Sequence, residues 1–414
     1  MRMRLHHWIK RFWLLFLMMV LFSYAMFQGG FVSWFLVYSF FPFCIYTFIL
    51  SFYSAKNWDV KASFSKEKVQ AGDKVEVNLQ FRRRSRFPIA FLALEQNVSS
   101  SLRFYDEGIN KYENLEKDLI PTERKVKQIL YPWMKKEFSV SYELDKLPRG
   151  EHFLESLVFS YGDPFGFLEK SFEIPFQQTL IVLPTVHELK MRFPASHQED
   201  GISGKLQQEA RKTNTVSAIR EYVAGDRFSW IDWKTTARKN AMMTKEFEHE
   251  KELDITCILD LSGDASRSQT TFEASVDITV SLLHALQKNR QQTNFWLYSN
   301  PVKLFSYEQV QYQLDVIVHY LATVRHEAIS FDYHRFPAIQ KSSCIWILSH
   351  LTEKKATEIS KWKKHAPHLT VIYIGPEKAI QGNKLLAKLQ SNGIHVLKMT
   401  EKVLTRHIWE VENR

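Results

Sequence analysis

The longest uncharged stretch of the chain lies near its N-terminus and sets the first constraint on the fold. Residues 12–55 include 44 positions without one Asp, Glu, Lys, Arg or His. A bilayer core of roughly 30 Å is crossed by about 20 helical residues, so this stretch has room for two crossings. Gly29 and Gly30 supply the break, because adjacent glycines turn a chain easily. The sequence predicts two transmembrane helices, at about 12–27 and 31–53.

The charges that flank this stretch predict its orientation. The turn between the helices has no charge, whereas the outer flanks have Arg2, Arg4, Lys10 and Arg11 on one side and Lys56 and Lys61 on the other. By the positive-inside rule, both termini are expected in the cytoplasm, in a multi-pass protein of the cell membrane with two helices. A cleaved signal peptide is the alternative, and it is disfavoured because the apolar run continues past the only small-residue site.

The overall charge narrows the classes of partner. The formal net charge is +10, which suits a protein that lies against an anionic inner leaflet. No nucleic-acid-binding motif is visible, so no nucleic-acid partner is expected. The basic run at 82–86 has two interpretations, a solvated loop between strands or a contact with lipid headgroups. Cys257 and Cys344 fall in apolar runs without disulfide or zinc spacing, and are interpreted as core residues in a reducing compartment.

The membrane anchor is predicted to comprise residues 1–56. The pattern of apolar and polar residues divides the rest of the chain into separate regions. In 57–184 the apolar residues alternate, as Val75, Val77 and Leu79 do, and turn signals recur, which predicts an all-β sandwich. Residues 185–216 are polar and without periodicity, and are predicted to be a linker.

Residues 251–414 alternate strand-like and helix-like runs, which predicts an α/β domain with a mostly parallel sheet covered on both faces. Ligands of such sheets bind beyond the carboxyl ends of the strands. Asp260, Ser262 and Asp264 follow the first predicted strand, and their oxygens are of the kind that hold Mg²⁺. Ordinary helix capping by the same residues is the alternative.

Residues 217–250, between linker and sheet, are dense in tryptophan and charge. One interpretation is an anion clamp made of Arg220, Lys234 and Arg238. The other pairs these cations with nearby carboxylates and buries Trp233 as structural bulk. Because no nucleophile, poised His or glycine-rich phosphate loop is present, structure and partner docking are favoured over catalysis. The candidate residues are Arg220, Tyr222, Gly225, Asp226, Asp232, Trp233, Lys234 and Arg238.

These residues resemble a known signature. The matching positions are Arg220-Glu221-Tyr222, Gly225-Asp226, Ile231, Trp233-Lys234 and Ala237-Arg238, preceded upstream by Arg149-Gly150 and by Asp163-Pro164-Phe165-Gly166-Phe167. Together they resemble the bacterial domain of unknown function 58 family over essentially the whole chain. The resemblance implies paired membrane helices, a strand-rich domain and a von Willebrand factor A-like domain.

The resemblance also implies partners. Members of the family are commonly encoded beside MoxR-type AAA+ ATPases and transglutaminase-like membrane proteins. It therefore implies a membrane-anchored scaffold or adaptor that binds such an ATPase, in envelope-related or complex-maturation work, and no enzymatic reaction. Two departures stand out: Ser229 replaces an Arg of many members, and Asp264 replaces the last Ser of the Asp-x-Ser-x-Ser metal-ion-dependent adhesion site. The predicted Mg²⁺ site is thus a degenerate one.

Two alternatives from other classes remain open. A metal-dependent phosphoester hydrolase would use Asp260, Asp264 and Asp232, with Lys234 and Arg238 holding the phosphate, although no general base is identifiable. A ligand-sensing membrane module would bind its ligand on the sandwich. The adaptor hypothesis differs from both in expecting that Asp260→Ala abolishes a partner complex and leaves the fold intact.

Overall fold

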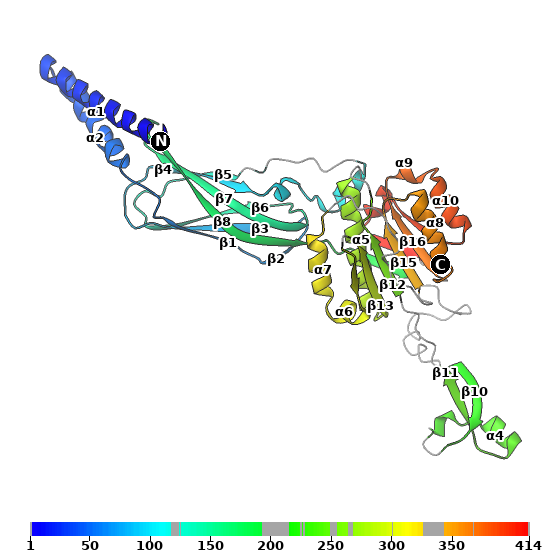
Figure 1. The fold of residues 1–414 in the computed structure, drawn as a ribbon. Coiled ribbons are helices and arrows are strands. Elements are labelled where there is room, and N and C mark those ends of the chain that lie inside the picture. Colours follow the sequence, from blue (N-terminus) through cyan, green and yellow to red (C-terminus); the bar gives the residue numbers. More distant parts are fainter. Residues whose placement is uncertain are drawn as a thin grey trace.

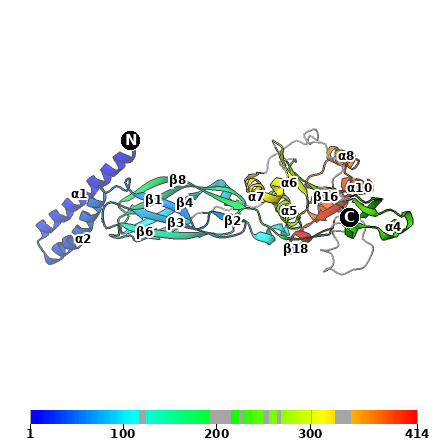
Figure 2. The same ribbon diagram turned by 90° about the horizontal axis from the view of Figure 1, so that it is seen from below.

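The computed structural model is an elongated molecule whose parts follow one another in a row (Figure 1). The helix pair lies at one end, the sandwich follows, and the α/β domain lies beyond it, as the view from below also shows (Figure 2). The predicted order of two apolar helices, a β-rich region and a mixed α/β domain is confirmed. The structure describes residues 2–116, 124, 126–192, 215–223, 226, 228–248, 255–263, 268–299, 301–325, 343–366 and 368–412.

Two apolar helices form the N-terminal hairpin. Helix α1 (Arg2–Gln28) and helix α2 (Phe31–Leu50) are joined at Gly29, whose φ of +60° is one that glycine adopts without strain. Each contains 20 consecutive residues long and apolar enough to cross a membrane. Most of their large apolar side chains are exposed, as expected for a lipid-facing surface. α1 begins ten residues before the predicted start, because its basic N-terminal turns continue the helix beyond the apolar span.

The sandwich consists of two sheets around one core. The apolar residues of β3 are buried and the polar residues between them face outward, as the predicted alternation requires, and Trp58 stacks on Phe159 inside at 5.3 Å. The three-stranded sheet contains β1 (Asp59–Phe64), β3 (Val75–Arg82) and β6 (Glu137–Leu144). The five-stranded sheet contains β2 (Lys68–Gln70), β8 (Glu169–Leu183), β7 (Gly150–Gly162), β4 (Phe91–Val98) and β5 (Val126–Leu130). The 3-10 helices η1 (Ser100–Arg103) and η2 (Gly108–Glu113) follow β4.

The α/β domain has a six-stranded sheet with helices on both faces. Its strand order is β14 (Lys303–Phe305), β13 (Thr293–Tyr298), β12 (Ile255–Asp260), β15 (Ser343–Leu348), β16 (Leu369–Ile374) and β17 (His395–Met399), and only β14 pairs antiparallel. The helices are α5 (Gln269–Lys288), α6 (Tyr307–Tyr312), α7 (Leu314–Thr323), α8 (Glu353–Trp362), α9 (Glu377–Ile380), α10 (Lys384–Ser391) and α11 (Glu401–Leu404).

Alternate residues of β12 belong to different cores. Cys257 and Leu259 pack with α5, α6 and α7, whereas Ile258 packs with α8 and α10. Burial on both faces explains why this strand is predominantly apolar. Cys257 and Cys344 are buried and free, as predicted, and burial raises the pKa of both thiols.

Part of the predicted linker is a strand. β9 (Glu188–Arg192) pairs in parallel with β18 (Ile408–Glu412), a C-terminal strand that the sequence pattern did not predict. The pairing is stabilised by the fully buried Trp409, which lies 4.2 Å from the ring of His187. A short polar strand of this kind is specified by its distant partner and not by its own periodicity. Residues 193–214 lie outside the described part of the chain.

Buried ion pairs join the sandwich to the α/β domain. Arg149, immediately before β7, donates to both carboxylate oxygens of Glu273 on α5, at 2.8 and 3.0 Å. Lys111 in η2 bridges Asp106 at 2.8 Å and Asp277 of α5 at 2.9 Å. Buried charges of this kind are retained where each has its partner, so the two domains pack in one defined orientation.

Candidate functional site

The end of β12 has a buried carboxylate held by the loop that follows it. Asp260 is only 1% exposed. Its Oδ1 accepts hydrogen bonds from the backbone N–H of Ser262, at 2.8 Å, and from the Ser262 hydroxyl. Asp260 is the last residue of β12 and Ser262 follows it, so their predicted place at the carboxyl end of a parallel strand is confirmed, whereas Asp264 lies outside the described residues.

A lysine ammonium lies where the sequence predicted a divalent cation. Lys355, 2% exposed, comes from the first turn of α8, and its Nζ lies 3.1 Å from Oδ2 of Asp260. The same Nζ donates to the carbonyl oxygens of Ser262 at 2.7 Å and of His350 at 3.1 Å. The ammonium thus has one carboxylate and two carbonyl oxygens around it, which is the coordination that a buried cation requires.

These donors do not fit Mg²⁺ while Lys355 holds this place. A magnesium ion takes about six oxygen ligands, and it would lie against a positive charge here. The Asp260 carboxylate already accepts from the Ser262 hydroxyl and backbone N–H on Oδ1 and faces the Lys355 ammonium with Oδ2. Within the described ranges, no three His, Cys, Asp or Glu side chains gather as metal ligands would. Magnesium at Asp260, Ser262 and Asp264 stays a prediction.

The signature residues fold as a small hairpin unit. β10 (Thr215–Glu221) pairs antiparallel with β11 (Met243–Glu248), and between them lie η3 (Phe228–Trp230) and helix α4 (Trp233–Lys239). We call residues 215–248, so far as they are described, the signature unit. Figure 1 shows it apart from the six-stranded sheet. The hydrolase hypothesis requires Lys234 and Arg238 of α4 to lie in one site with Asp260. In the structure they do not (Figure 1).

An ion pair closes the turn of the signature unit. Arg220 donates to both carboxylate oxygens of Asp226, at 2.9 and 2.7 Å, and the backbone N–H of Val223 donates to the same carboxylate at 3.0 Å. These hydrogen bonds hold the pKa of Asp226 below its ordinary value. The structural pairing predicted for Arg220 is confirmed, so this arginine is not a member of an open anion clamp. Gly225 lies outside the described residues.

Asp232 starts helix α4. Its Oδ1 accepts from the backbone N–H groups of Lys234 and Thr235, both at 3.1 Å, which is the geometry of an N-cap. Ile231 beside it is buried and pairs with Thr244 of β11, so the start of α4 is fixed to the hairpin. The carboxylate of Asp232 therefore has a structural role, as the N-cap of α4.

The outer face of the signature unit is aromatic and basic. Phe228 is 72% exposed and Trp233 is 67% exposed, so the predicted burial of Trp233 is wrong. Lys234 and Arg238 are exposed on α4 and lie four residues apart, as predicted. Tyr222 stacks on Phe228 at 6.2 Å. The small signature unit thus exposes two large rings and two cations whose exposure its own fold does not require.

A polar cavity lies at the junction of the two domains. It has a volume of about 620 Å³ and includes Tyr105, Arg149, Glu155 and Glu273 in its lining. This cavity could not be predicted from local sequence patterns, because its walls come from segments more than 100 residues apart. The guanidinium and the carboxylate of the Arg149–Glu273 pair already bond to each other.

The fold defines a class: a chain with a membrane-length helical hairpin, a β-sandwich and a parallel α/β domain that has a separate signature unit. The family described as "Protein of unknown function DUF58" matches residues 218–351. The "Uncharacterized protein YeaD" of Bacillus subtilis (strain 168) is 36% identical over 287 residues, which are 68% of this chain and 67% of that protein. The chain belongs to the DUF58 family.

Solved structures resemble the chain only distantly. A DUF4466 family protein from Parabacteroides merdae ATCC 43184 has a TM-score of 0.17 at 9% identity, over 30% of this chain and 44% of that one. Cwp6 from Clostridium difficile has a TM-score of 0.16 at 10% identity, over 84% of this chain and 39% of that one. Likeness of this degree carries no argument about fold or function.

Proposed function

We propose that this protein is a membrane-anchored adaptor whose signature unit binds a protein partner, with a MoxR-type AAA+ ATPase as that partner. The observation that carries the proposal is the exposed aromatic and basic face of the signature unit. Trp and Arg are the residues that most often dominate the free energy of binding at protein interfaces. Phe228 and Trp233 would bury apolar area, and Lys234 and Arg238 would meet acidic side chains of the partner.

The placement of the adaptor follows from the anchor. In Figure 1 the N-terminal end of α1 and the sandwich lie at the same end of the helix pair. Because that end is basic, the positive-inside rule puts both domains and both termini in the cytoplasm. An ATPase of the cytoplasm could reach the signature unit there, and a transglutaminase-like membrane protein is a second partner compatible with this placement.

The α/β domain would be von Willebrand factor A-like. In support, Asp260 ends a central parallel strand between two helical layers, and Ser262 follows it. In domains of that kind a divalent cation takes part in docking. Here the buried ammonium of Lys355 balances the charge of the Asp260 carboxylate instead. We therefore propose docking that needs no metal and assign no catalytic reaction to the site.

The test is co-purification of the full-length protein in mild detergent, with bound proteins identified by mass spectrometry. Wild type is compared with Trp233→Ala and with the double variant Lys234→Gln/Arg238→Gln. Tyr312→Ala serves as the matched control, because Tyr312 is an exposed aromatic residue on α6 of the α/β domain. We expect a AAA+ ATPase with wild type and the control, and its loss with both signature variants.

A further inference from the structure

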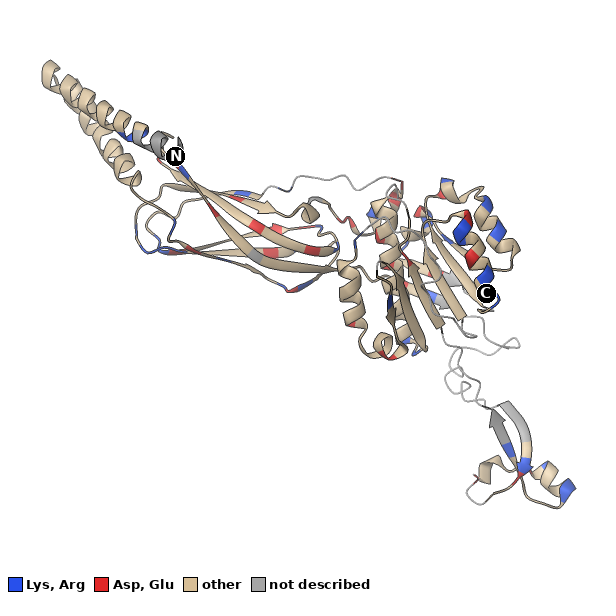
Figure 3. Ribbon diagram, viewed as in Figure 1, with Lys and Arg blue, Asp and Glu red and all other residues tan. Residues whose placement is uncertain are grey.

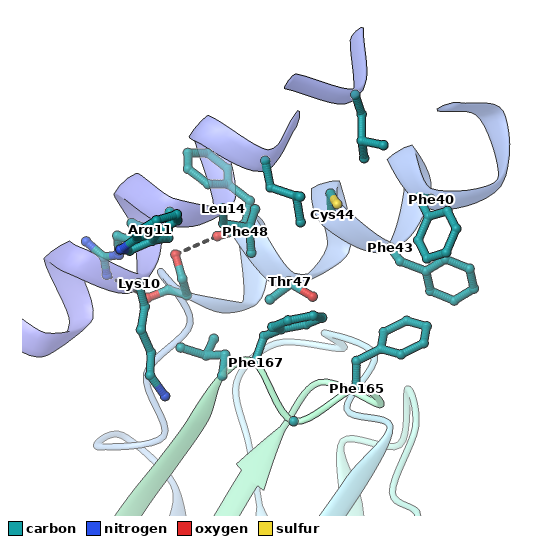
Figure 4. A pocket seen from close by; sticks show the side chains of 16 residues that line it. Lys10, Arg11, Leu14, Phe40, Phe43, Cys44, Thr47, Phe48, Phe165 and Phe167 are labelled. Carbon is teal, nitrogen blue, oxygen red and sulfur yellow. Dashed lines mark hydrogen bonds between the residues drawn. The ribbon is translucent and has the colours of Figure 1, made fainter. Parts of the chain in front are cut away.

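A largely apolar cavity lies between the membrane helices and the sandwich (Figure 4). Its volume is about 770 Å³, which falls in the range of small-ligand and cofactor sites. The apolar walls come from both helices and from the loop after β7, and include Leu14, Leu17, Phe40, Phe43, Phe165 and Phe167. A cavity at this place belongs neither to the signature unit nor to the Asp260 site.

The loop that closes the cavity is held rigidly. A Cβ at Gly162 would lie 2.4 Å from the carbonyl oxygen of Leu168, so only glycine allows the two strands to approach in this way. The Asp163 carboxylate accepts hydrogen bonds from the backbone N–H groups of Phe165 and Leu168. The turn directs Phe165 toward the helices (Figure 4), and its ring meets that of Phe43 edge-on at 5.1 Å.

One end of the cavity is positively charged. Lys10 and Arg11 line it at the end opposite Phe40 and Phe43 (Figure 4). Arg11 and Lys170 both donate to the carbonyl oxygen of Ser51, at 2.6 and 2.7 Å. Burial, and secondarily the nearby charge of Arg11, lower the pKa of Lys170 to about 8. Arg11 and Lys170 thus hold two positive charges close together at this end, and an anion placed here would be attracted to both.

The surroundings match the headgroup level of a membrane. Lys10 follows Ile9, the first residue of the first membrane-length span. Loops at this end of the sandwich present Trp133 and Lys135 to the outside, and lysines and arginines gather there (Figure 3). Aromatic and basic residues are typical of the membrane–water interface.

We propose that this cavity binds one anionic phospholipid, with its phosphate at Lys10 and Arg11 and an acyl chain along the apolar wall. The charge at one end and the apolar lining at the other match the two parts of such a molecule. This site is independent of partner docking by the signature unit. The bound lipid would fill the space between the helices and the Phe165–Phe167 turn, and so fix the sandwich against the membrane.

The test uses the full-length protein in lipid nanodiscs made of equal parts phosphatidylglycerol and phosphatidylcholine. The protein is released into the gas phase, and native mass spectrometry counts the lipids that remain bound. The variants are Lys10→Gln, which removes the charge, and Leu14→Trp, which fills the cavity. Lys135→Gln is the control, because it removes the same charge from the same end of the sandwich but outside the cavity.

We expect wild type and Lys135→Gln to retain one phosphatidylglycerol in preference to phosphatidylcholine. Lys10→Gln should lower this preference about five-fold, the effect of one lysine near an anionic lipid surface. Leu14→Trp should lose the bound lipid. Equal retention of the two lipids by wild type would overturn the proposal. So would an equal loss in Lys10→Gln and Lys135→Gln, which would indicate general surface attraction, or a lipid-free dimer, which would assign the cavity to a second copy.

Discussion

Removal of the Asp260 charge should destabilise the α/β domain, contrary to the expectation from sequence that Asp260→Ala leaves the fold intact. Asp260 and Lys355 are both buried, and their charged atoms lie 3.1 Å apart. Asp260→Asn keeps the shape of the side chain but leaves the ammonium of Lys355 without its carboxylate. Lys355→Met leaves the carboxylate without its ammonium. Removing one partner of a buried ion pair costs about 3–5 kcal/mol.

This loss is large beside the total free energy of unfolding, which for a domain is about 5–15 kcal/mol. For a domain of this size it corresponds to a fall in the unfolding midpoint of roughly 6–20 °C. The double variant Asp260→Asn/Lys355→Met removes both charges, and its loss should be several kcal/mol smaller than the sum of the single losses. The assay is thermal unfolding of the full-length protein in detergent, followed by circular dichroism, with and without Mg²⁺.

Two results would refute this reasoning. If either single variant unfolded at the wild-type temperature, the ion pair would not stabilise the domain. If Mg²⁺ raised the midpoint of the wild type but not of Asp260→Asn, a metal would bind at the carboxylate that we assign to Lys355, because a ligand stabilises the state to which it binds.

Three further predictions concern other parts of the molecule. Arg149→Met should lower the free energy of unfolding by about 3–5 kcal/mol, because Glu273 stays buried without its partner, and hydrogen exchange should increase in α5; unchanged exchange would contradict the role of this pair. Burial lowers the pKa of His152 from 6.5 to about 4, so the unfolded chain binds the extra proton between these values. Stability should therefore be complete above pH 6.5 and fall by about 3 kcal/mol as pH drops to 4, a slope that calorimetry should find reduced in His152→Gln. Asp232→Ala should cost about 1 kcal/mol by removing the N-cap of α4, with faster hydrogen exchange confined to that helix.

The sequence predicted best what local pattern determines. The uncharged run of the anchor, the alternation of apolar residues in β3 and the continuous apolar run of β12 each correspond to an element of the structure. In each case the spacing of apolar residues within one segment indicates which faces of that segment are buried or in contact with lipid. The apolar pattern does not mark the breaks between α6 and α7, at Gln313, and between α9 and α10, near Gly382, because helix boundaries depend on short-range backbone geometry.

The candidate site was predictable only in part. Asp260 and Ser262 could be placed beyond a strand, but Lys355 comes from a helix 95 residues further on, and nothing near it marks it as the partner of a carboxylate. The exposure of Trp233 was equally out of reach, since tryptophan in a folded segment is usually buried. Both features depend on which distant elements pack together, which the local pattern does not encode.

The most direct test of the account is the affinity of the signature unit's outer face for a protein partner. The purified full-length protein, wild type or Trp233→Ala, is titrated with the AAA+ ATPase recovered by co-purification, and binding is measured by interferometry in the presence of EDTA. We predict that wild type binds without a divalent cation and that Trp233→Ala binds at least ten-fold more weakly, as expected for loss of about 2 kcal/mol at an interface hot spot. Equal affinity of the two proteins, or binding that requires a divalent cation, would contradict the account.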